Sequence, residues 1–234
     1  MPVEEYHVAL WRRMLRPIMM AILRGVFYLL TSVRVTGTEN VPRGQPYLAV
    51  INHVSTFDGP FVGAFWPEIL EAVGAIEVWQ RPGQQIVAVL YGGIPVHRGD
   101  VDRAMLDRVL AALRSGRPLL LAPEGGRSHT PGLQRAKAGV AFILDEARVP
   151  IVPVGVIGAT DDFWKRASHL QRPAIEMHIG KPFRLPPIEG RGAERRAARQ
   201  SNADQVMAHI AALLPEEYRG VYSNGALLTE QAGN

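Results

Sequence analysis

Short apolar runs alternate along the chain with longer segments whose apolar residues recur at helical spacing, and this alternation constrains the fold most strongly. Continuous apolar strands separated by such helices are typical of a mainly parallel sheet covered by helices. We therefore expect an α/β fold with a mostly parallel central sheet flanked by helices. The predicted strands are 33–36, 47–51, 93–96, 118–122, 151–156 and 175–179, and the clearest core-facing helices are 102–115 and 134–147.

The chain has 234 residues, enough for one domain with a single large core. We expect a helical N-terminal segment over 1–32, an α/β domain over 33–214 and a C-terminal tail over 215–234 whose end is mobile. Residues 186–200 are rich in Pro, Gly, Arg and Ala and predict a surface connection. An amphipathic helix is expected to follow over 203–214.

The charge balance is moderately basic, with 26 Lys and Arg against 22 Asp and Glu and a sequence pI near 9.7. Such an excess favours anionic partners such as phosphate esters or acidic lipid headgroups. Because the chain has no cysteine, a thiolate nucleophile, a disulfide framework and a Cys-based zinc site are excluded. Aromatic platforms and a basic recognition helix are missing, so nucleic acid is not an expected partner.

The N-terminal segment 11–30 has the pattern of a basic amphipathic helix, or of two helices broken near Pro17. Arg16 and Arg24 interrupt its apolar runs, which are too short to span a bilayer, and no signal-peptide cleavage site follows. The segment could lie in a membrane interface, with arginines attracted to anionic lipid and the apolar side buried, or pack on its own domain. One sector holds Arg12, Arg13, Arg16 and Arg24, and the other Trp11, Met14, Leu15, Ile18, Ile22, Val26 and Leu29.

Polar clusters follow three of the predicted strands, and sites in open α/β sheets form beyond the carboxyl ends of strands. These clusters are 52–58, His97–Arg98 and 124–128. We expect them to converge at one edge of the sheet.

His53 and Asp58 can meet if His53 lies in the loop and Asp58 in the first turn of the following helix. Asp58 would then orient the imidazole and stabilise it once protonated, which makes His53 a candidate general base. The alternative is that Asp58 only caps the helix and that His53 is an ordinary loop residue.

The segment Glu124-Gly125-Gly126-Arg127-Ser128 ends a buried apolar strand with a charged, flexible turn. Its glycines permit positive φ and close backbone approach, so successive amides could cradle an anion beside the Arg127 guanidinium. Arg98 and Lys137 are further candidates for a phosphate site. The alternative is an ordinary turn with solvated surface charges.

Taken together, four ordered segments resemble the four blocks of the lysophosphatidate and glycerol-3-phosphate acyltransferases, and the resemblance covers about residues 33–183. They are Asn52-His53 through Asp58, Gly93 through Arg98, Pro123 through Ser128 with Lys137-Ala138-Gly139, and Val149 through Val154.

The resemblance implies a peripheral membrane enzyme of phospholipid synthesis on the cytoplasmic face. It would move a fatty acyl group from acyl-CoA or acyl carrier protein to the free hydroxyl of 1-acyl-glycerol-3-phosphate, with no acyl-enzyme, metal or redox cofactor. The implied partners are a lipid acceptor in the membrane, the acyl donor and an anionic membrane surface. The implied base is His53 with its partner Asp58, the acceptor-binding residues are Arg98, Glu124, Gly125, Arg127 and Lys137, and further candidates are Asn52, Gly126 and Ser128.

Gly126 departs from the family pattern, because the family commonly has Thr where this chain has Gly. A hydroxyl is therefore missing beside the acceptor site, and the acceptor is less determined than the chemistry. The alternatives are glycerol-3-phosphate, another lysophospholipid or an acylated amino-acid lipid as acceptor, or a non-catalytic lipid-binding protein of the same fold.

Overall fold

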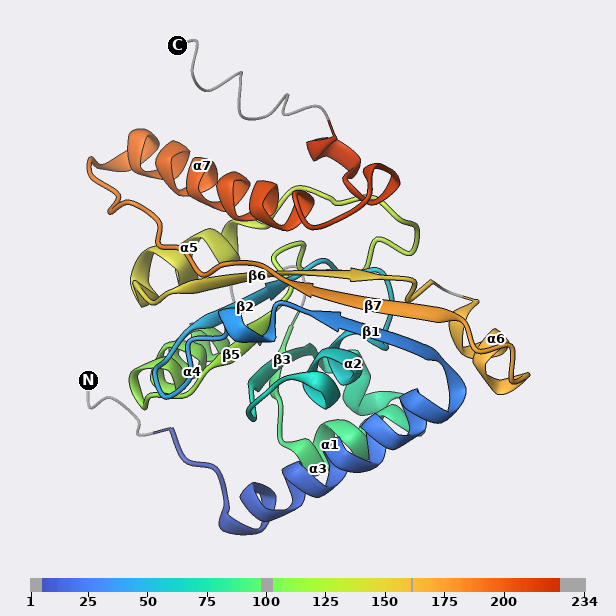
Figure 1. Cartoon of the computed structure of the whole chain (residues 1–234). Coiled ribbons are helices and arrows are strands. Elements are labelled where there is room, and N and C mark those ends of the chain that lie inside the picture. Colours follow the sequence, from blue (N-terminus) through green and yellow to red (C-terminus); the bar gives the residue numbers. More distant parts are fainter. Residues whose placement is uncertain (1–5, 98–102, 161, 224–234) are drawn as a thin grey trace.

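The computed structural model describes residues 6–97, 103–160 and 162–223, and within them seven strands form one sheet in the order β1-β7-β6-β2-β5-β3-β4 (Figure 1). The strands are β1 (Ser32–Thr36), β2 (Leu48–Ile51), β3 (Glu71–Ala75), β4 (Ile94–Val96), β5 (Leu119–Leu121), β6 (Ile151–Ile157) and β7 (Ala174–Ile179). The helices are α1 (Leu10–Leu30), α2 (Asp58–Phe65), α3 (Gln84–Tyr91), α4 (Arg103–Arg114), α5 (Ala138–Ala147), α6 (Phe163–Ser168) and α7 (Gly192–Ala211).

Strand directions confirm the predicted, mostly parallel sheet. β6, β2, β5, β3 and β4 run parallel to one another. β7 pairs antiparallel with β6 and parallel with β1, so these two strands at one edge run in the opposite direction. The carboxyl ends of β2 and β5 therefore lie side by side.

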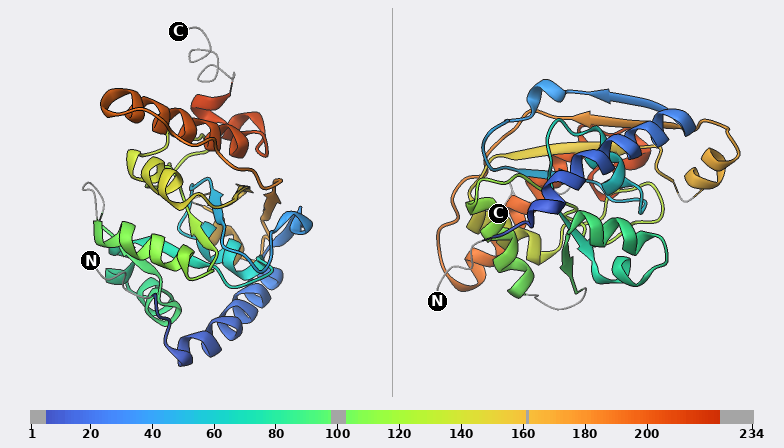
Figure 2. Two further views of the ribbon diagram at one scale, coloured as in Figure 1. Left: turned by 90° about the vertical axis from the view of Figure 1, so that its left-hand side faces the viewer. Right: turned by 90° about the horizontal axis from the view of Figure 1, so that it is seen from below.

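Helices cover both faces of the sheet, which explains why its central strands read as unbroken apolar runs. Along β2, Leu48 and Val50 enter the core that α4, α5 and α7 cover. Ala49 and Ile51 enter the opposite core, which packs against α1 and α2. These helices lie on the two sides of the sheet in Figure 2. Each β2 side chain is thus buried whichever face it points to.

Strand β3 and the start of helix α7 differ from the sequence prediction. β3 was not predicted, because its sequence Glu-Ala-Val-Gly-Ala starts with a charge, contains a glycine and lacks a continuous apolar run. Helix α7 begins at Gly192, so the predicted connection over 186–200 is wrong for its second half. That half is rich in Ala and Arg, which favour helix without making an apolar stripe. Arg195 and Arg199 also bind Asp145 of α5, at 2.9 and 2.8 Å, and this tertiary contact was not readable from the pattern.

The first part of the C-terminal tail is ordered by packing rather than by an apolar pattern of its own. Short 3₁₀ turns form at Glu216–Tyr218 and Gly220–Tyr222. Leu133 N donates to Tyr218 O at 3.0 Å, and Val221 N donates to Leu133 O at 3.2 Å. The tail therefore holds the loop that follows β5. The predicted mobile end, 224–234, lies outside the described residues.

Helix α1 runs unbroken through Pro17, so of the two expected alternatives the structure shows one helix and not two. Arg16 is only 1% exposed and forms a two-pronged ion pair with Glu71, at 2.7 and 2.9 Å, while its Nε donates to Tyr91 O. Arg24 Nε donates to Ala64 O at 2.7 Å. These contacts offset the hydrogen bond that proline removes and fix α1 against α2, α3 and β3.

The side of α1 that faces the domain is therefore the side with arginines, which corrects the expectation that Arg16 lies among lipid headgroups. The apolar side of α1 is exposed, and so are two residues of α3. Helix α3 packs against α1 (Figure 1). We call this surface the apolar face. It comprises Leu10, Trp11, Met14, Ile18, Ile22 and Leu29 of α1, which are 50–70% exposed, with Ile86 and Val89 of α3, which are 57% and 46% exposed.

Candidate active site

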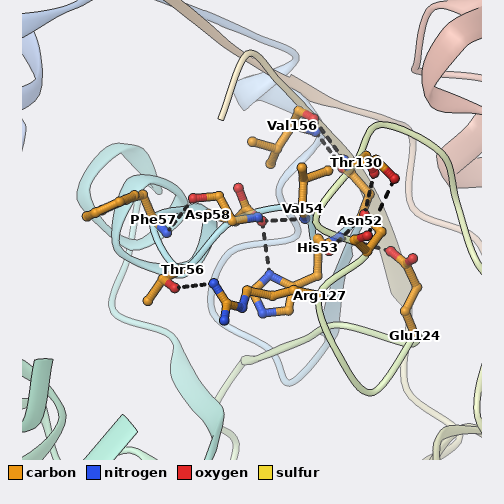
Figure 3. A network of polar contacts seen from close by, with 12 residues as sticks. Asn52, His53, Val54, Thr56, Phe57, Asp58, Glu124, Arg127, Thr130 and Val156 are labelled. Carbon is orange, nitrogen blue, oxygen red and sulfur yellow. Dashed lines mark hydrogen bonds and ion pairs between the residues drawn. The ribbon is translucent and has the colours of Figure 1, made fainter. Parts of the chain in front are cut away.

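The neighbouring positions of β2 and β5 bring two of the three predicted clusters together. The loop after β2 carries His53, and the loop after β5 carries Glu124 and Arg127. These loops contact each other directly: Glu124 Oε1 accepts from His53 N at 2.9 Å, and Ser128 N donates to His53 O at 2.9 Å (Figure 3). The predicted convergence is thus observed for these clusters. Arg98, in the third cluster, lies outside the described residues.

His53 and Asp58 form the predicted contact, with His53 Nδ1 2.9 Å from Asp58 Oδ2 (Figure 3). Asp58 is the first residue of α2, and the intervening loop turns its carboxylate back toward the imidazole. The His53 side chain is 22% exposed and that of Asp58 is 1% exposed. Among the described residues, no hydrogen-bond partner meets His53 Nε2. The imidazole is therefore held at one nitrogen and open at the other.

The same carboxylate oxygen also organises the loop. Asp58 Oδ2 accepts from Val54 N and Ser55 N, each at 2.8 Å. Burial raises the pKa of Asp58, while the hydrogen bonds from His53 and from these two amides oppose that rise. Asp58 thus holds both the His53 imidazole and the loop before α2, and the amides that it accepts from precede the helix, so the helix-cap interpretation is not what the structure shows.

Glu124 braces the site from within. It is 1% exposed, and while Oε1 accepts from His53 N, Oε2 accepts from Gln134 N at 2.9 Å. Burial raises the pKa of Glu124, and the two amide hydrogen bonds oppose the rise. Both carboxylate oxygens are thus engaged by backbone on either side of the site. Its predicted role in acceptor binding stays a prediction.

Arg127 lies beside the imidazole in Figure 3, and its Nη1 donates to Thr56 Oγ1 at 2.9 Å. It is partly exposed, so its guanidinium is a positive charge within reach of solvent beside His53. An arginine in this position suits a planar anionic group such as a phosphate or carboxylate. Thr56 was not predicted as a site residue, because a lone threonine in a loop carries no signal of its own.

The two glycines after Glu124 differ in what the backbone requires. Gly125 has φ +65°, and a Cβ there would lie 2.7 Å from Lys137 Cγ. Gly126 has an ordinary φ, and a Cβ there would have no neighbour within 4 Å. The predicted need for glycine is therefore confirmed at Gly125 alone. Lys137 is exposed, and the aliphatic part of its side chain lies against Gly125.

The side chains of Asn52 and Ser128 form hydrogen bonds with backbone groups. The Asn52 amide donates to Val156 O at 2.8 Å and accepts from Val156 N at 2.7 Å, so it extends the pairing of β2 with β6 past the end of β2. Ser128 Oγ donates to Thr130 O at 2.7 Å. These partners come from β6 and from the loop after β5, which sequence spacing alone could not identify.

Comparison with known proteins assigns the chain to a family. The family model described as Acyltransferase matches residues 32–157, more than half of the chain. This protein belongs to the acyltransferase family. The paired His53 and Asp58, the Glu124–Ser128 loop and Lys137 all lie inside the matched region.

Relatives of this acyltransferase act on different lipids. A lyso-ornithine lipid O-acyltransferase from Pseudomonas aeruginosa is 29% identical over 200 residues, which cover 80% of this chain and 76% of that protein. The 1-acyl-sn-glycerol-3-phosphate acyltransferase alpha of Homo sapiens is 25% identical over 163 residues, which cover 68% of this chain but only 56% of the human protein.

A solved structure confirms the fold of the acyltransferase. The 1-acyl-sn-glycerophosphate (LPA) acyltransferase PlsC from Thermotoga maritima matches 83% of this chain and 79% of that one, with a TM-score of 0.60 and 20% identity. Within the described parts of the chain, no three or more His, Cys, Asp or Glu side chains gather as a metal site would require. None of the helices in the described ranges is long and apolar enough to cross a bilayer.

Proposed function

We propose that this acyltransferase moves a fatty acyl group from acyl-CoA or acyl carrier protein to the free hydroxyl of a lysolipid, with 1-acyl-glycerol-3-phosphate as the acceptor and phosphatidate as the product. The observation that carries the proposal is the His53–Asp58 contact, which orients a half-open imidazole at the junction of two loops inside the matched region. Family membership supports the reaction type, and the site geometry supports His53 as the base.

In the proposed reaction, His53 Nε2 removes the proton of the acceptor hydroxyl as its oxygen attacks the thioester carbonyl. Asp58 accepts a hydrogen bond from His53 Nδ1–H and stabilises the imidazolium. When the tetrahedral intermediate collapses, the C–S bond breaks and the imidazolium returns the proton to the thiolate. The ester and the free thiol result, so atoms and charges balance without a covalent enzyme intermediate.

The acceptor's anionic headgroup would meet Arg127, with Lys137 and Arg98 as further proposed contacts. Arg127 is held at one end by Thr56 and presents its remaining donors beside the imidazole. A negative group bound there would position the neighbouring hydroxyl next to Nε2. We therefore expect Arg127 to affect acceptor binding more strongly than the chemical step.

The decisive experiment incubates purified protein with lysophosphatidate and either oleoyl-CoA or oleoyl carrier protein and analyses the lipid product. We expect phosphatidate from the wild type, turnover lowered by at least about a hundredfold in His53→Ala, and a raised acceptor KM with nearly unchanged kcat in Arg127→Ala. Circular dichroism of His53→Ala checks that the variant is folded. Near-normal turnover by folded His53→Ala would refute the proposed base, and no turnover by the wild type with any lipid acceptor would favour a lipid-binding protein.

A second acceptor class, an acylated amino-acid lipid, has a specific observation in its favour. The lyso-ornithine lipid relative aligns over more of this chain and more of its own length than the human relative does. Gly126 also lacks the hydroxyl that the family commonly places beside the acceptor. Lyso-ornithine lipid, lysophosphatidate and glycerol-3-phosphate should therefore be compared in one assay, and the highest kcat/KM identifies the acceptor. A phosphate-free acceptor that needs Arg127 equally would remove the phosphate role assigned to that residue.

The apolar face supports the further proposal that the protein docks on a membrane surface. Six exposed apolar side chains of α1 lie beside exposed Ile86 and Val89 of α3, and a surface of this kind marks an interaction site. Because the arginine side is turned inward, insertion of apolar side chains would dominate over attraction by Arg16. The exposed Arg13 remains available to anionic headgroups.

Sedimentation with phosphatidylglycerol vesicles tests the docking. We expect Ile18→Glu to lower vesicle binding by about tenfold or more, because a charge would have to enter the apolar layer. Val221→Glu, at an apolar residue that is 51% exposed near the C-terminus, is the matched control and should bind as the wild type does. Equal vesicle binding by Ile18→Glu and the wild type would refute the proposal that the apolar face is the docking surface.

A further inference from the structure

A stacked aromatic pair lies directly against the loop that carries the proposed catalytic residues. Phe57 immediately precedes Asp58, and its ring stacks on Trp164 of α6, with centroids 5.1 Å apart and planes 16° apart. Phe57 is half-buried, whereas Trp164 is 40% exposed. A large indole is thus left partly in solvent although it packs on a loop of the active site.

The position of α6 explains this contact. α6 follows β6, and Asn52 holds β6 at Val156 through both of its amide atoms. β6 and β2 run parallel, so their carboxyl ends lie at the same edge of the sheet. Trp164 therefore lies at the edge where His53 lies.

Aromatic contacts connect this pair with the end of α1. Phe163, which is fully buried, lies 6.3 Å from Phe57 and 6.5 Å from Phe27 of α1, between ring centroids. Beyond α6, Arg172 Nη2 donates to Tyr28 O and Thr31 O, each at 3.2 Å, which holds this segment against the end of α1. Buried rings and these hydrogen bonds thus pack α6, which carries Trp164, against the end of α1.

We propose that Phe57 and Trp164 form the wall against which the acyl chain of the lipid acceptor lies while its hydroxyl reaches His53. This inference rests on the proposed function and names the part of the acceptor that the aromatic pair recognises. The proposed occupant is the acceptor's chain, because α6 packs on the end of α1, whose apolar face is proposed to dock on the membrane that holds the acceptor. The indole and phenyl faces offer apolar area without a charge, which suits methylene groups.

Acceptors that differ only in acyl-chain length test whether Phe57 and Trp164 contact the chain. Initial rates are measured in solution without vesicles, with oleoyl and hexanoyl lysophosphatidate at concentrations where both are monomeric. For Trp164→Ala we expect the KM of the oleoyl acceptor to rise about tenfold, with unchanged kcat and an unchanged KM for the hexanoyl acceptor, because only the long chain loses its contact. Trp164→Phe keeps a ring on Phe57 and should restore most of the affinity.

The controls separate this inference from the others. Val221→Ala truncates an exposed apolar residue elsewhere and should leave both KM values unchanged. An equal rise in KM for both acceptors, or no rise in KM for either, would refute the proposed contact between the aromatic pair and the acyl chain. So would a Trp164→Ala protein that loses only vesicle binding, since Trp164 would then belong to the membrane contact alone. If the wild-type protein is inactive with every lipid acceptor, the proposed function and this inference are both refuted. If the wild type is active and Trp164→Ala has unchanged KM values, only this inference is refuted.

Discussion

Replacing Glu124 by alanine distinguishes a residue that braces the active site from one that binds the acceptor. The side chain is 1% exposed and accepts two backbone hydrogen bonds, from His53 N and Gln134 N, both at 2.9 Å. Alanine would leave two amide groups without acceptors. At about 1–3 kcal/mol for each buried donor left unsatisfied, the free energy of unfolding should fall by about 2–6 kcal/mol.

Glu124→Gln gives an intermediate case. Its single carbonyl oxygen can serve one of the two amides, while its NH₂ group faces the other, so about half of that loss is expected. Urea unfolding measures the loss, and steady-state kinetics on the folded fraction should show a larger fall in kcat than rise in acceptor KM, because the loop of His53 shifts. Glu217→Ala, at an exposed glutamate, controls for the loss of one negative charge.

An acceptor-binding role makes the opposite prediction. If Glu124 contacted the acceptor, Glu124→Ala would raise the acceptor KM while the free energy of unfolding stayed within about 1 kcal/mol of the wild type, as for most substitutions away from buried partners. That result would refute the bracing role. Glu124→Ala as stable as Glu217→Ala would refute it equally well.

Four further substitutions test other parts of the structure. Gly126→Thr should change the free energy of unfolding by less than about 0.5 kcal/mol, whereas Gly125→Ala should cost about 1–2 kcal/mol through its positive φ; thermal unfolding of both measures this, and equal losses would contradict it. Arg16→Ala should cost about 3 kcal/mol in urea unfolding, because the Glu71 carboxylate stays buried; a loss below about 1 kcal/mol would show that the pair does not fix α1. Two arginines lower the pKa of Asp145, so its contribution is present above its unfolded pKa and is lost as the pH falls from about 4 through the folded pKa. Asp145→Asn should lose about 1 kcal/mol of unfolding free energy at pH 7 and progressively less below about pH 4. A constant difference in urea unfolding measured across this pH range would contradict this.

Local patterns predicted much of the fold because central strands buried on both faces must be continuously apolar. Strands such as β2 and β6, and helix α4, were found close to their predicted positions. β3 was missed because a short strand with a charge and a glycine has no such pattern. The ordered turns at 216–222 were missed because they are stabilised by Leu133, far away in the sequence.

For the site, the sequence by itself predicted the contact between His53 and Asp58, because they stand in one short segment and their contact needs only a loop and the first turn of a helix. What only the tertiary structure decided is how the other residues are used. Glu124 and Arg127 follow a different strand, and Arg16 lies on a different helix, so their partners depend on strand order and helix packing. Glu124 and Arg16 are buried, and a charge removed from water needs a partner close by. Glu124 found two amides and Arg16 found Glu71, and neither partner leaves a periodic signal in the sequence.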